Sequence, residues 1–129
     1  MATRERLKAE KLLEKKKASK VAVASLKGLK MSARKARVVA SVIRGEGVAK
    51  AVTSLAFQRK ASAKPLQILL ESAVANAENK GLDVDKLIIS EIMVDKGPIM
   101  KRFMPRAHGK ATRIRKQTAH VEIKLKESN

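Results

Sequence analysis

The sequence contains no cysteine, tryptophan or tyrosine, and its only aromatic residues are Phe57 and Phe103. The absence of cysteine excludes disulfide bonds, thiolate nucleophiles and cysteine-bound metal ions. The scarcity of aromatic residues predicts a small aliphatic core that contains one of the two phenylalanines. It also argues against a surface that stacks single-stranded bases on aromatic rings. Any bound nucleic acid is therefore expected to be held by its phosphates and its shape.

Long apolar runs and catalytic groupings are missing as well. No apolar stretch reaches the roughly 18 residues of a membrane span, and none follows the N-terminal charges as in a secretory signal. The two histidines, His108 and His120, have no partner at the spacing of a metal site or a catalytic triad. Asp83 and Asp85 could flank a metal ion, but they lie in a turn after a predicted helix, where aspartate is common anyway. We therefore expect no catalysis, no metal and no cofactor.

Acidic residues are few and unevenly distributed. The 129 residues include 30 Lys or Arg but only 12 Asp or Glu, which gives a net charge of +18. Net charge is +5 over residues 1–20, +8 over 21–60, −3 over 61–95 and +8 over 96–116. A protein that is basic only for solubility would not need this segregation, whereas a polyanionic partner explains it.

The chain divides into a charged tail and one domain. Residues 1–20 are rich in helix-forming residues, with glutamates spaced among lysines, but they contain few large apolar side chains. They are consistent either with a tail that is disordered alone and helical when bound, or with a merely solvating tail. Residues 21–129 are predicted to form a single nucleic-acid-binding domain, which begins with a strand at 21–29.

Three helices are predicted within that domain. The first begins at the capping residue Ser32 and ends at Gly45, and the second spans 48–57. The third is expected to be capped by Ser62 and to run through Asn79. Pro65 lies in the first turn of the third helix, where its missing N–H costs nothing. The third helix carries one continuous apolar stripe and is predicted to be the core helix.

The first of these helices has a basic side and an apolar side. The basic side consists of Arg34, Arg37, Ser41 and Arg44. The other side is apolar, with Val38, Val39, Val42 and Ile43, and Lys35 is its one exception. A solvated face usually mixes Glu with Arg, and the helix contains no acid. The basic side is therefore predicted to contact nucleic acid.

The last basic stretch lies between two predicted strands, at 87–94 and 117–126. The second strand alternates apolar and polar residues with the two-residue period of a half-buried strand. The 22 residues from Asp95 to Lys116 include eight Lys or Arg, and they far exceed the two to five residues of an ordinary hairpin loop. Continued as a ribbon, each side would reach on the order of 35 Å from the body. We predict a basic β-arm that enters folded nucleic acid and is ordered by it.

The order of elements predicts an α+β fold. Three helices pack on a small antiparallel three-stranded sheet, and a long basic β-hairpin, at about 87–126, protrudes from it.

Three stretches carry a family resemblance: SARKARVVASVIRG at 32–45, ESAVANAENKGLDVDKL at 71–87 and VDKGPIMKRFMPRAHGKATRIRKQTAHVEI at 94–123. They resemble the bacterial type of the large-subunit ribosomal protein L22 family. The third stretch is the most specific, because it contains four short motifs at the positions where that family has them. These motifs are Gly-Pro, Lys-Arg, Pro-Arg-Ala and Arg-Ile-Arg-Lys. Three motifs in the same order over some ninety residues make the resemblance strong.

The resemblance implies a body that binds large-subunit (23S-type) rRNA near the outer end of the peptide exit tunnel, in a cytoplasmic, ribosome-bound protein. It implies that the hairpin reaches inward and that its tip lines the tunnel wall beside another large-subunit protein, near nascent peptide and macrolide antibiotics. The resemblance also implies that the protein has roles in subunit assembly and translation. The expected rRNA-binding residues are Arg34, Lys35, Arg37, Arg44, Lys96, Lys101, Arg102, Arg106, Lys110, Arg113, Arg115 and Lys116. The expected tunnel-tip residues are Pro98, Ile99, Met100, Lys101, Arg102, Phe103 and Met104.

Two departures and two alternatives stand beside this interpretation. The family usually has proline where this chain has Ala33, which leaves the start of the helix less rigidly set. The N-terminal tail is longer and more charged than in many members, so no function is transferred to residues 1–20.

An architectural protein could wrap DNA with basic β-arms and kink it with Pro98 or Pro105. Such proteins generally dimerise, and the chain has no spare apolar surface for a dimer, so a monomer is expected outside the ribosome. A binder of acidic proteins or membranes would need a basic amphipathic helix with aromatic residues, which is lacking.

Overall fold

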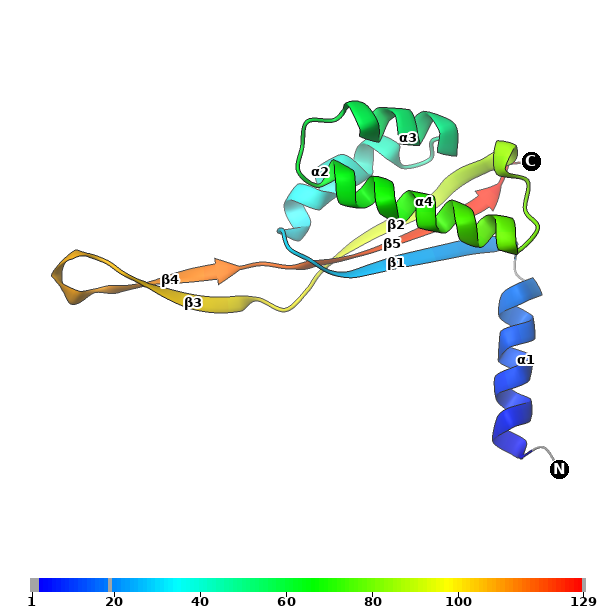
Figure 1. Ribbon diagram of the computed structural model, residues 1–129, viewed down its shortest axis with the longest axis horizontal. Helices are drawn as coiled ribbons and strands as arrows, with labels where there is room; N and C mark the ends of the chain where they lie inside the picture. Colours follow the sequence, from blue (N-terminus) through cyan, green and yellow to red (C-terminus); the bar gives the residue numbers. More distant parts are fainter. Residues whose placement is uncertain (1–2, 19, 129) are drawn as a thin grey trace.

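The computed structural model describes residues 3–18 and 20–128. The helices are α1 (Arg4–Ala18), α2 (Ala33–Ile43), α3 (Val48–Phe57) and α4 (Ala63–Asn79), with 3-10 turns η1 (Val84–Lys86) and η2 (Ala107–Gly109). The strands are β1 (Val21–Leu29), β2 (Leu87–Lys96), β3 (Met100–Pro105), β4 (Ala111–Lys116) and β5 (Ala119–Glu127). Figure 1 shows a body of helices and sheet, with a two-stranded arm extending from one end and α1 standing away from the other.

The body is an antiparallel sheet of order β1-β5-β2, covered on one face by α2, α3 and α4 (Figure 1). In β5, Val121, Ile123 and Leu125 are buried and alternate with half-buried polar residues, because successive side chains of a strand point to opposite faces. Leu66 and Leu70 of α4 are completely buried in the same core. The predicted α+β architecture is confirmed.

The number of helices differs from the prediction, because the tail contains a fourth helix, α1. It spans 15 residues, and its side chains from Arg4 to Lys15 are all exposed. Helix formation agrees with the helix-forming composition of the tail. The stability of an isolated helix of this length is marginal in water. Because these side chains of α1 are exposed, tertiary contacts add little to its stability.

The core contains neither phenylalanine, which corrects the prediction. Phe57 is 83% exposed and Phe103 is 67% exposed. The side of α3 that faces the core contains Val48, Ala51 and Leu55. Phe57 follows Leu55 by two residues, about 200° around the helix, so it points away from the sheet.

Helix α2 also presents a different side to the core than expected. Its cap is confirmed, since the Ser32 hydroxyl accepts a hydrogen bond from the Lys35 N–H at 3.4 Å. The buried residues are Ala33, Ala36, Val39, Ala40 and Ile43. Val38 and Val42 are 46% and 47% exposed. Small alanines rather than these two valines therefore face the sheet, which lets the helix approach it closely.

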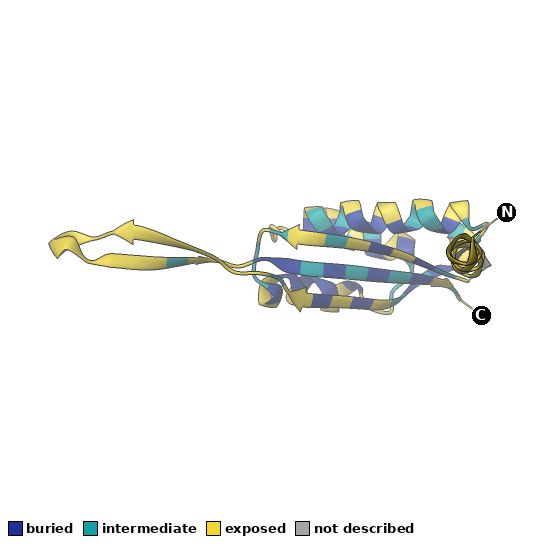
Figure 2. Cartoon of the chain, turned by 90° about the horizontal axis from the view of Figure 1, so that it is seen from below, coloured by how far each residue is buried: buried dark blue, intermediate teal, exposed yellow. Residues whose placement is uncertain are grey.

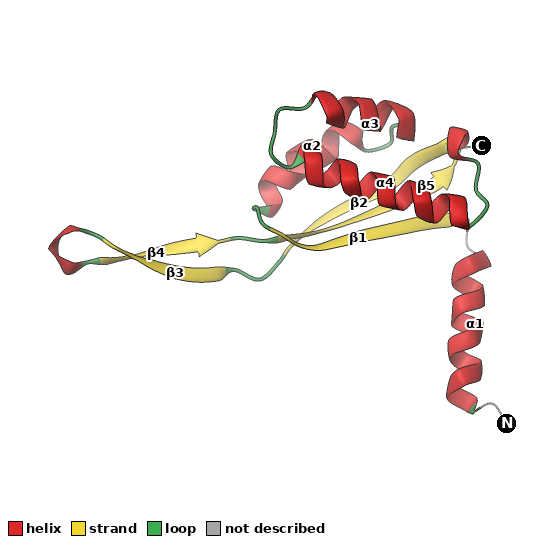
Figure 3. Ribbon diagram, viewed as in Figure 1, coloured by secondary structure: helices red, strands yellow, loops and turns green. Residues whose placement is uncertain are grey.

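The arm is a separate two-stranded ribbon of β3 and β4. Pairing runs from Met100 opposite Lys116 to Pro105 opposite Ala111, and η2 closes the far end (Figure 3). Figure 2 shows the contrast in burial between arm and body. All six residues of β3 are exposed, and only Ile114 of β4 is half-buried. The arm therefore has no core of its own.

A joint connects the arm to the body sheet. Three residues on one side, 97–99, face two on the other, 117–118, so the pairing shifts by one residue between the two sheets. The Gly97 N–H donates to the Thr118 carbonyl at 2.9 Å, and the buried Thr118 hydroxyl donates to the Pro98 carbonyl at 2.7 Å. Because an unequal pairing of this kind bends and twists a strand, the joint sets the direction of the arm.

Candidate nucleic-acid interface

The paired strands of the arm carry cations on both faces. Residues opposite each other in an antiparallel pair share a face, so Lys101, Arg113 and Arg115 lie on one side. Arg102 and Lys116 lie on the other side. No acid occurs among residues 96–116. A ribbon that is basic on both faces suits insertion between two polyanionic walls better than docking on a single surface.

The turn of the arm lies farther along the chain than predicted. Arg106 and Lys110 flank it, with a hydrogen bond from the Arg106 N–H to the Lys110 carbonyl at 2.7 Å. His108 and Gly109 have positive φ angles of 66° and 68° and make the reversal. Residues 98–104, expected at the tip, instead run along the outgoing side, because the register places the reversal between Pro105 and Ala111.

The start of α2 and the returning side of the arm form one basic hollow, here called the root hollow. It has a volume of about 490 Å³ and is lined by Lys30, Met31, Ser32, Arg34, Lys35, Arg115 and Gln117. Four of these residues are cations and none is acidic. The structure therefore joins two basic stretches that the sequence predicted separately, and it adds Lys30, which was missed. A cleft lined by charges of one sign concentrates ions of the opposite sign.

Arg37 and Arg44 have a structural role that the sequence did not indicate. Arg37 donates from Nε and Nη2 to the Val94 carbonyl at 3.1 and 3.0 Å, and Arg44 donates to the Ile92 carbonyl at 3.0 Å. Backbone hydrogen bonds of the segment after α2 continue this contact along β2. The two arginines thus cover the open edge of the sheet. A guanidinium has five donors, so both side chains keep donors for a phosphate.

Replacing Arg37 by alanine should lower the free energy of unfolding by about 1–2 kcal/mol, because two hydrogen bonds from a charged donor are lost at a partly exposed site. Arg34 is the matched control, since it lies on the same helix and makes no hydrogen bond within the described residues. Arg34→Ala should change the free energy of unfolding by less than about 0.5 kcal/mol. Urea denaturation of both variants measures the difference, and equal losses would contradict a stabilising edge contact.

The uncovered face of the sheet has a different charge character. Glu91 lies opposite Lys124, and Asp95 lies opposite His120, on the side away from the helices. The Lys124 ammonium is 3.1 Å from the Glu91 carboxylate. That hydrogen bond, together with the carboxylate charge, raises the pKa of Lys124 above its ordinary value. Nearby carboxylates already balance the positive charge of Lys124. This face is therefore a poorer site for polyanions than the arm and the root hollow.

Within residues 3–18 and 20–128, no helix has both the length and the apolar character of a membrane span. The same residues contain no group of three or more His, Cys, Asp or Glu side chains placed to hold a metal ion.

Comparison with known proteins places the chain in a family. The sequence profile of the family described as ribosomal protein L22p/L17e matches residues 24–126. The large ribosomal subunit protein uL22 of Geobacter sulfurreducens is 50% identical over 105 residues, covering 81% of this chain and 95% of the relative. The proteins of the same name from Bdellovibrio bacteriovorus and Myxococcus xanthus are each 50% identical, over 105 and 108 residues, covering 81% of this chain and 96% and 95% of the relatives. The chain belongs to the ribosomal protein L22p/L17e family.

Proposed function

We propose that this protein is a structural constituent of the large ribosomal subunit and binds large-subunit rRNA through the arm, the root hollow and the basic side of α2. The observation that carries the proposal is the arm itself, an exposed ribbon with cations on both faces and no acid. Its like charges repel one another, and it buries almost no apolar surface. Surrounding phosphates would supply the stabilisation that the arm lacks alone.

The finer part of the proposal concerns the exit tunnel. We propose that the arm lines the tunnel wall, with residues 98–104 along its outgoing side and the turn at 106–110 farthest from the body. Nascent peptide and macrolide antibiotics are the partners proposed there, beside neighbouring large-subunit proteins. The protein would be a monomer before assembly and would then be ribosome-bound in the cytoplasm. The family resemblance supports this part, and the protruding position of the arm is consistent with it.

Architectural DNA binding is less well supported. The relatives named above are large-subunit ribosomal proteins. A ribbon basic on both faces also suits a site enclosed by RNA more than the groove of one duplex.

Substituting alanine for Arg113, Arg115 and Lys116 should weaken rRNA binding and reduce its dependence on salt. Each lost phosphate contact lowers the slope of log K against log salt concentration by about 0.7–0.9, so the triple variant should lose about 2–3 units. Filter binding to large-subunit rRNA across a salt series measures the slope.

The matched control is a triple alanine variant of Lys8, Lys11 and Lys15 in α1, which removes the same charge from a different place. Its slope should change less. Equal losses in the two variants would mean that net charge, rather than the arm, determines binding.

A further inference from the structure

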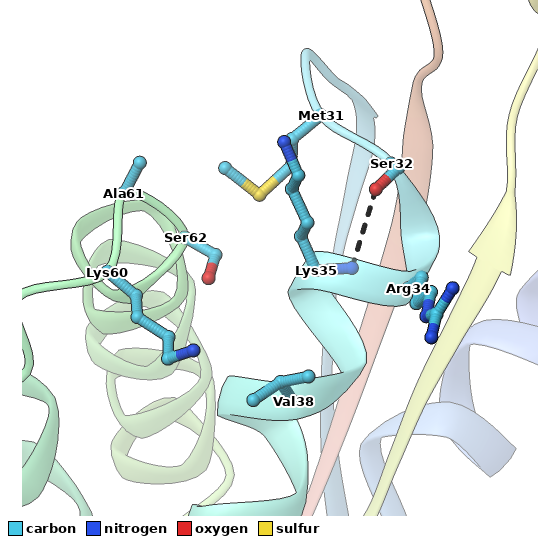
Figure 4. Close-up of a pocket in the computed structure, with 8 residues that line it drawn as sticks. All are labelled: Met31, Ser32, Arg34, Lys35, Val38, Lys60, Ala61 and Ser62. Atoms are coloured by element: carbon cyan, nitrogen blue, oxygen red, sulfur yellow. Dashed lines mark hydrogen bonds between the residues drawn. The ribbon is translucent and has the colours of Figure 1, made fainter.

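A second hollow adjoins the root hollow at the start of α2 and extends between α2 and the beginning of α4; it is here called the interhelical pocket. The two hollows share Met31, Ser32, Arg34 and Lys35. The interhelical pocket has a volume of about 550 Å³, within the range of about 300–1,000 Å³ that small-molecule sites occupy. Its lining residues are Met31, Ser32, Arg34, Lys35, Val38, Lys60, Ala61 and Ser62. Figure 4 shows Lys35 and Lys60 at its sides, and shows Arg34 turned away from it.

Ser62 is the unusual residue of this pocket. It is only 2% exposed, yet its side chain makes no capping hydrogen bond to α4 and no other hydrogen bond within the described part of the chain. The described residues contain no fully enclosed polar side-chain atom without a partner. The small exposed area of Ser62 must therefore include its hydroxyl, which faces the space between α4 and α2 in Figure 4. A ligand in the pocket can reach this hydroxyl as donor or acceptor.

The remaining lining combines positive charge with apolar surface. Lys35 and Lys60 bring two ammonium groups to the pocket, and no acidic residue lines it. Val38 is 46% exposed although it is apolar, and the thioether of Met31 points into the pocket in Figure 4. Methionine sulfur makes favourable contacts with aromatic rings. The pocket therefore offers a place for a flat ring beside a place for an anion, which is the chemistry of a nucleotide.

We propose that the interhelical pocket binds one unstacked nucleotide of an RNA chain. The base lies against Met31 and Val38, its polar edge meets the Ser62 hydroxyl, and its phosphate lies between Lys35 and Lys60. Sequence-specific recognition of RNA commonly targets unstacked bases of loops and bulges and forms hydrogen bonds to their edges. The inference rests on the proposed function, because the nucleotide belongs to the bound RNA. It adds a contact to a base, beyond the phosphate contacts of the arm.

Methyl and amide NMR of the full-length protein tests the proposal with three probes: AMP, ribose 5-phosphate and inorganic phosphate. Each probe is titrated until the amide shifts of Lys60 and Ala61 saturate, because these two residues line the interhelical pocket and not the root hollow. Saturation of these signals reports an occupied phosphate position. AMP should then shift the Met31 and Val38 methyl signals several times more than ribose 5-phosphate does. Equal methyl shifts from all three probes would reduce the pocket to a simple anion site. A failure of the amide signals to respond would remove the site altogether, and either result overturns the proposal.

Two variants and one matched control sharpen the test. Ser62→Ala should weaken AMP binding, because the partner of the base edge is lost, without lowering thermal stability, because Ser62 makes no capping hydrogen bond. Lys60→Gln should also weaken it, whereas Lys64→Gln, an exposed lysine on α4 outside the pocket, should not. Equal effects of the two lysine variants would contradict a defined site. Binding of large-subunit rRNA by the same samples separates the two proposals. If the protein binds rRNA but shows no AMP-specific methyl shifts, only the proposal of a nucleotide pocket is refuted.

Discussion

Deleting the arm should leave a folded body that binds large-subunit rRNA far more weakly. Residues 98–117 can be replaced by an Asn-Gly turn, because the Gly97 N–H already donates to the Thr118 carbonyl at 2.9 Å and such a turn suits a two-residue hairpin. The removed segment contains seven Lys or Arg and no acid, so the net charge falls from +18 to +11. If each cation contacts one phosphate, the salt slope of rRNA binding should fall by about 5–6 units.

The body should remain stable because the removed residues bury almost nothing. We expect the free energy of unfolding to change by less than about 1 kcal/mol, mostly through the loss of the Pro98 carbonyl as partner of Thr118. A variant lacking residues 1–20 loses a net charge of +5 but keeps the arm, and it serves as the control. An unchanged salt slope after deletion of the arm would place the phosphate contacts elsewhere.

Replacing Gly97 by alanine should destabilise the joint between the arm and the body sheet. A Cβ atom at this position would collide with Thr118 Oγ1 and lie 3.3 Å from the His120 ring. Thr118 is buried, and His120 Nδ1 accepts a hydrogen bond from the Gly28 N–H at 3.0 Å, so neither neighbour moves without loss. We expect the free energy of unfolding to fall by about 1–3 kcal/mol, as for other overpacked sites.

The matched control is Gly47→Ala, because nothing lies within 4 Å of a Cβ at that position and its φ angle is −64°. That variant should be nearly neutral. Adding Thr118→Ala to Gly97→Ala removes the colliding oxygen, so the double variant should lose less stability than the two single losses together. Additive losses in urea denaturation would contradict the steric explanation.

The sequence was most informative where one local pattern determines an element. The alternation in β5 and the capping residue of α2 predicted elements that the structure contains, because the period of a strand and a serine cap act within a few residues. The exposure of Phe57 was not predictable in the same way. It depends on which side of α3 meets the sheet, and that choice is made by tertiary packing.

The position of the turn in the arm was mispredicted for a related reason. The register of the ribbon is set where Lys96 pairs with Ala119, and each step outward on one side is matched by a step on the other, apart from the shift at the joint. That register brings the reversal to His108 and Gly109. A pairing register between distant residues is not visible in the sequence of a basic stretch without alternation.

The candidate interface was predicted in its parts but not in its assembly. The basic residues of the arm and of α2 were identified because they cluster in the chain. Two features arise only when separate elements pack together. They are the contact of Arg37 with the edge of β2 and the placement of Lys60 and Lys35 in one pocket. Single cations such as Lys30 and Lys60 carry no local signal that distinguishes them from other surface lysines.

Co-sedimentation of the tagged protein in a lysate gradient tests the central claim most directly. The gradient is run in low salt with magnesium, and again after a high-salt wash, with the arm-deleted variant in parallel. The proposed function predicts stoichiometric presence in the large-subunit peak that survives the wash, and loss of the variant from that peak. Release of the intact protein by the wash, or its absence from the large subunit, would mean a loosely bound polyanion binder and would contradict the proposal.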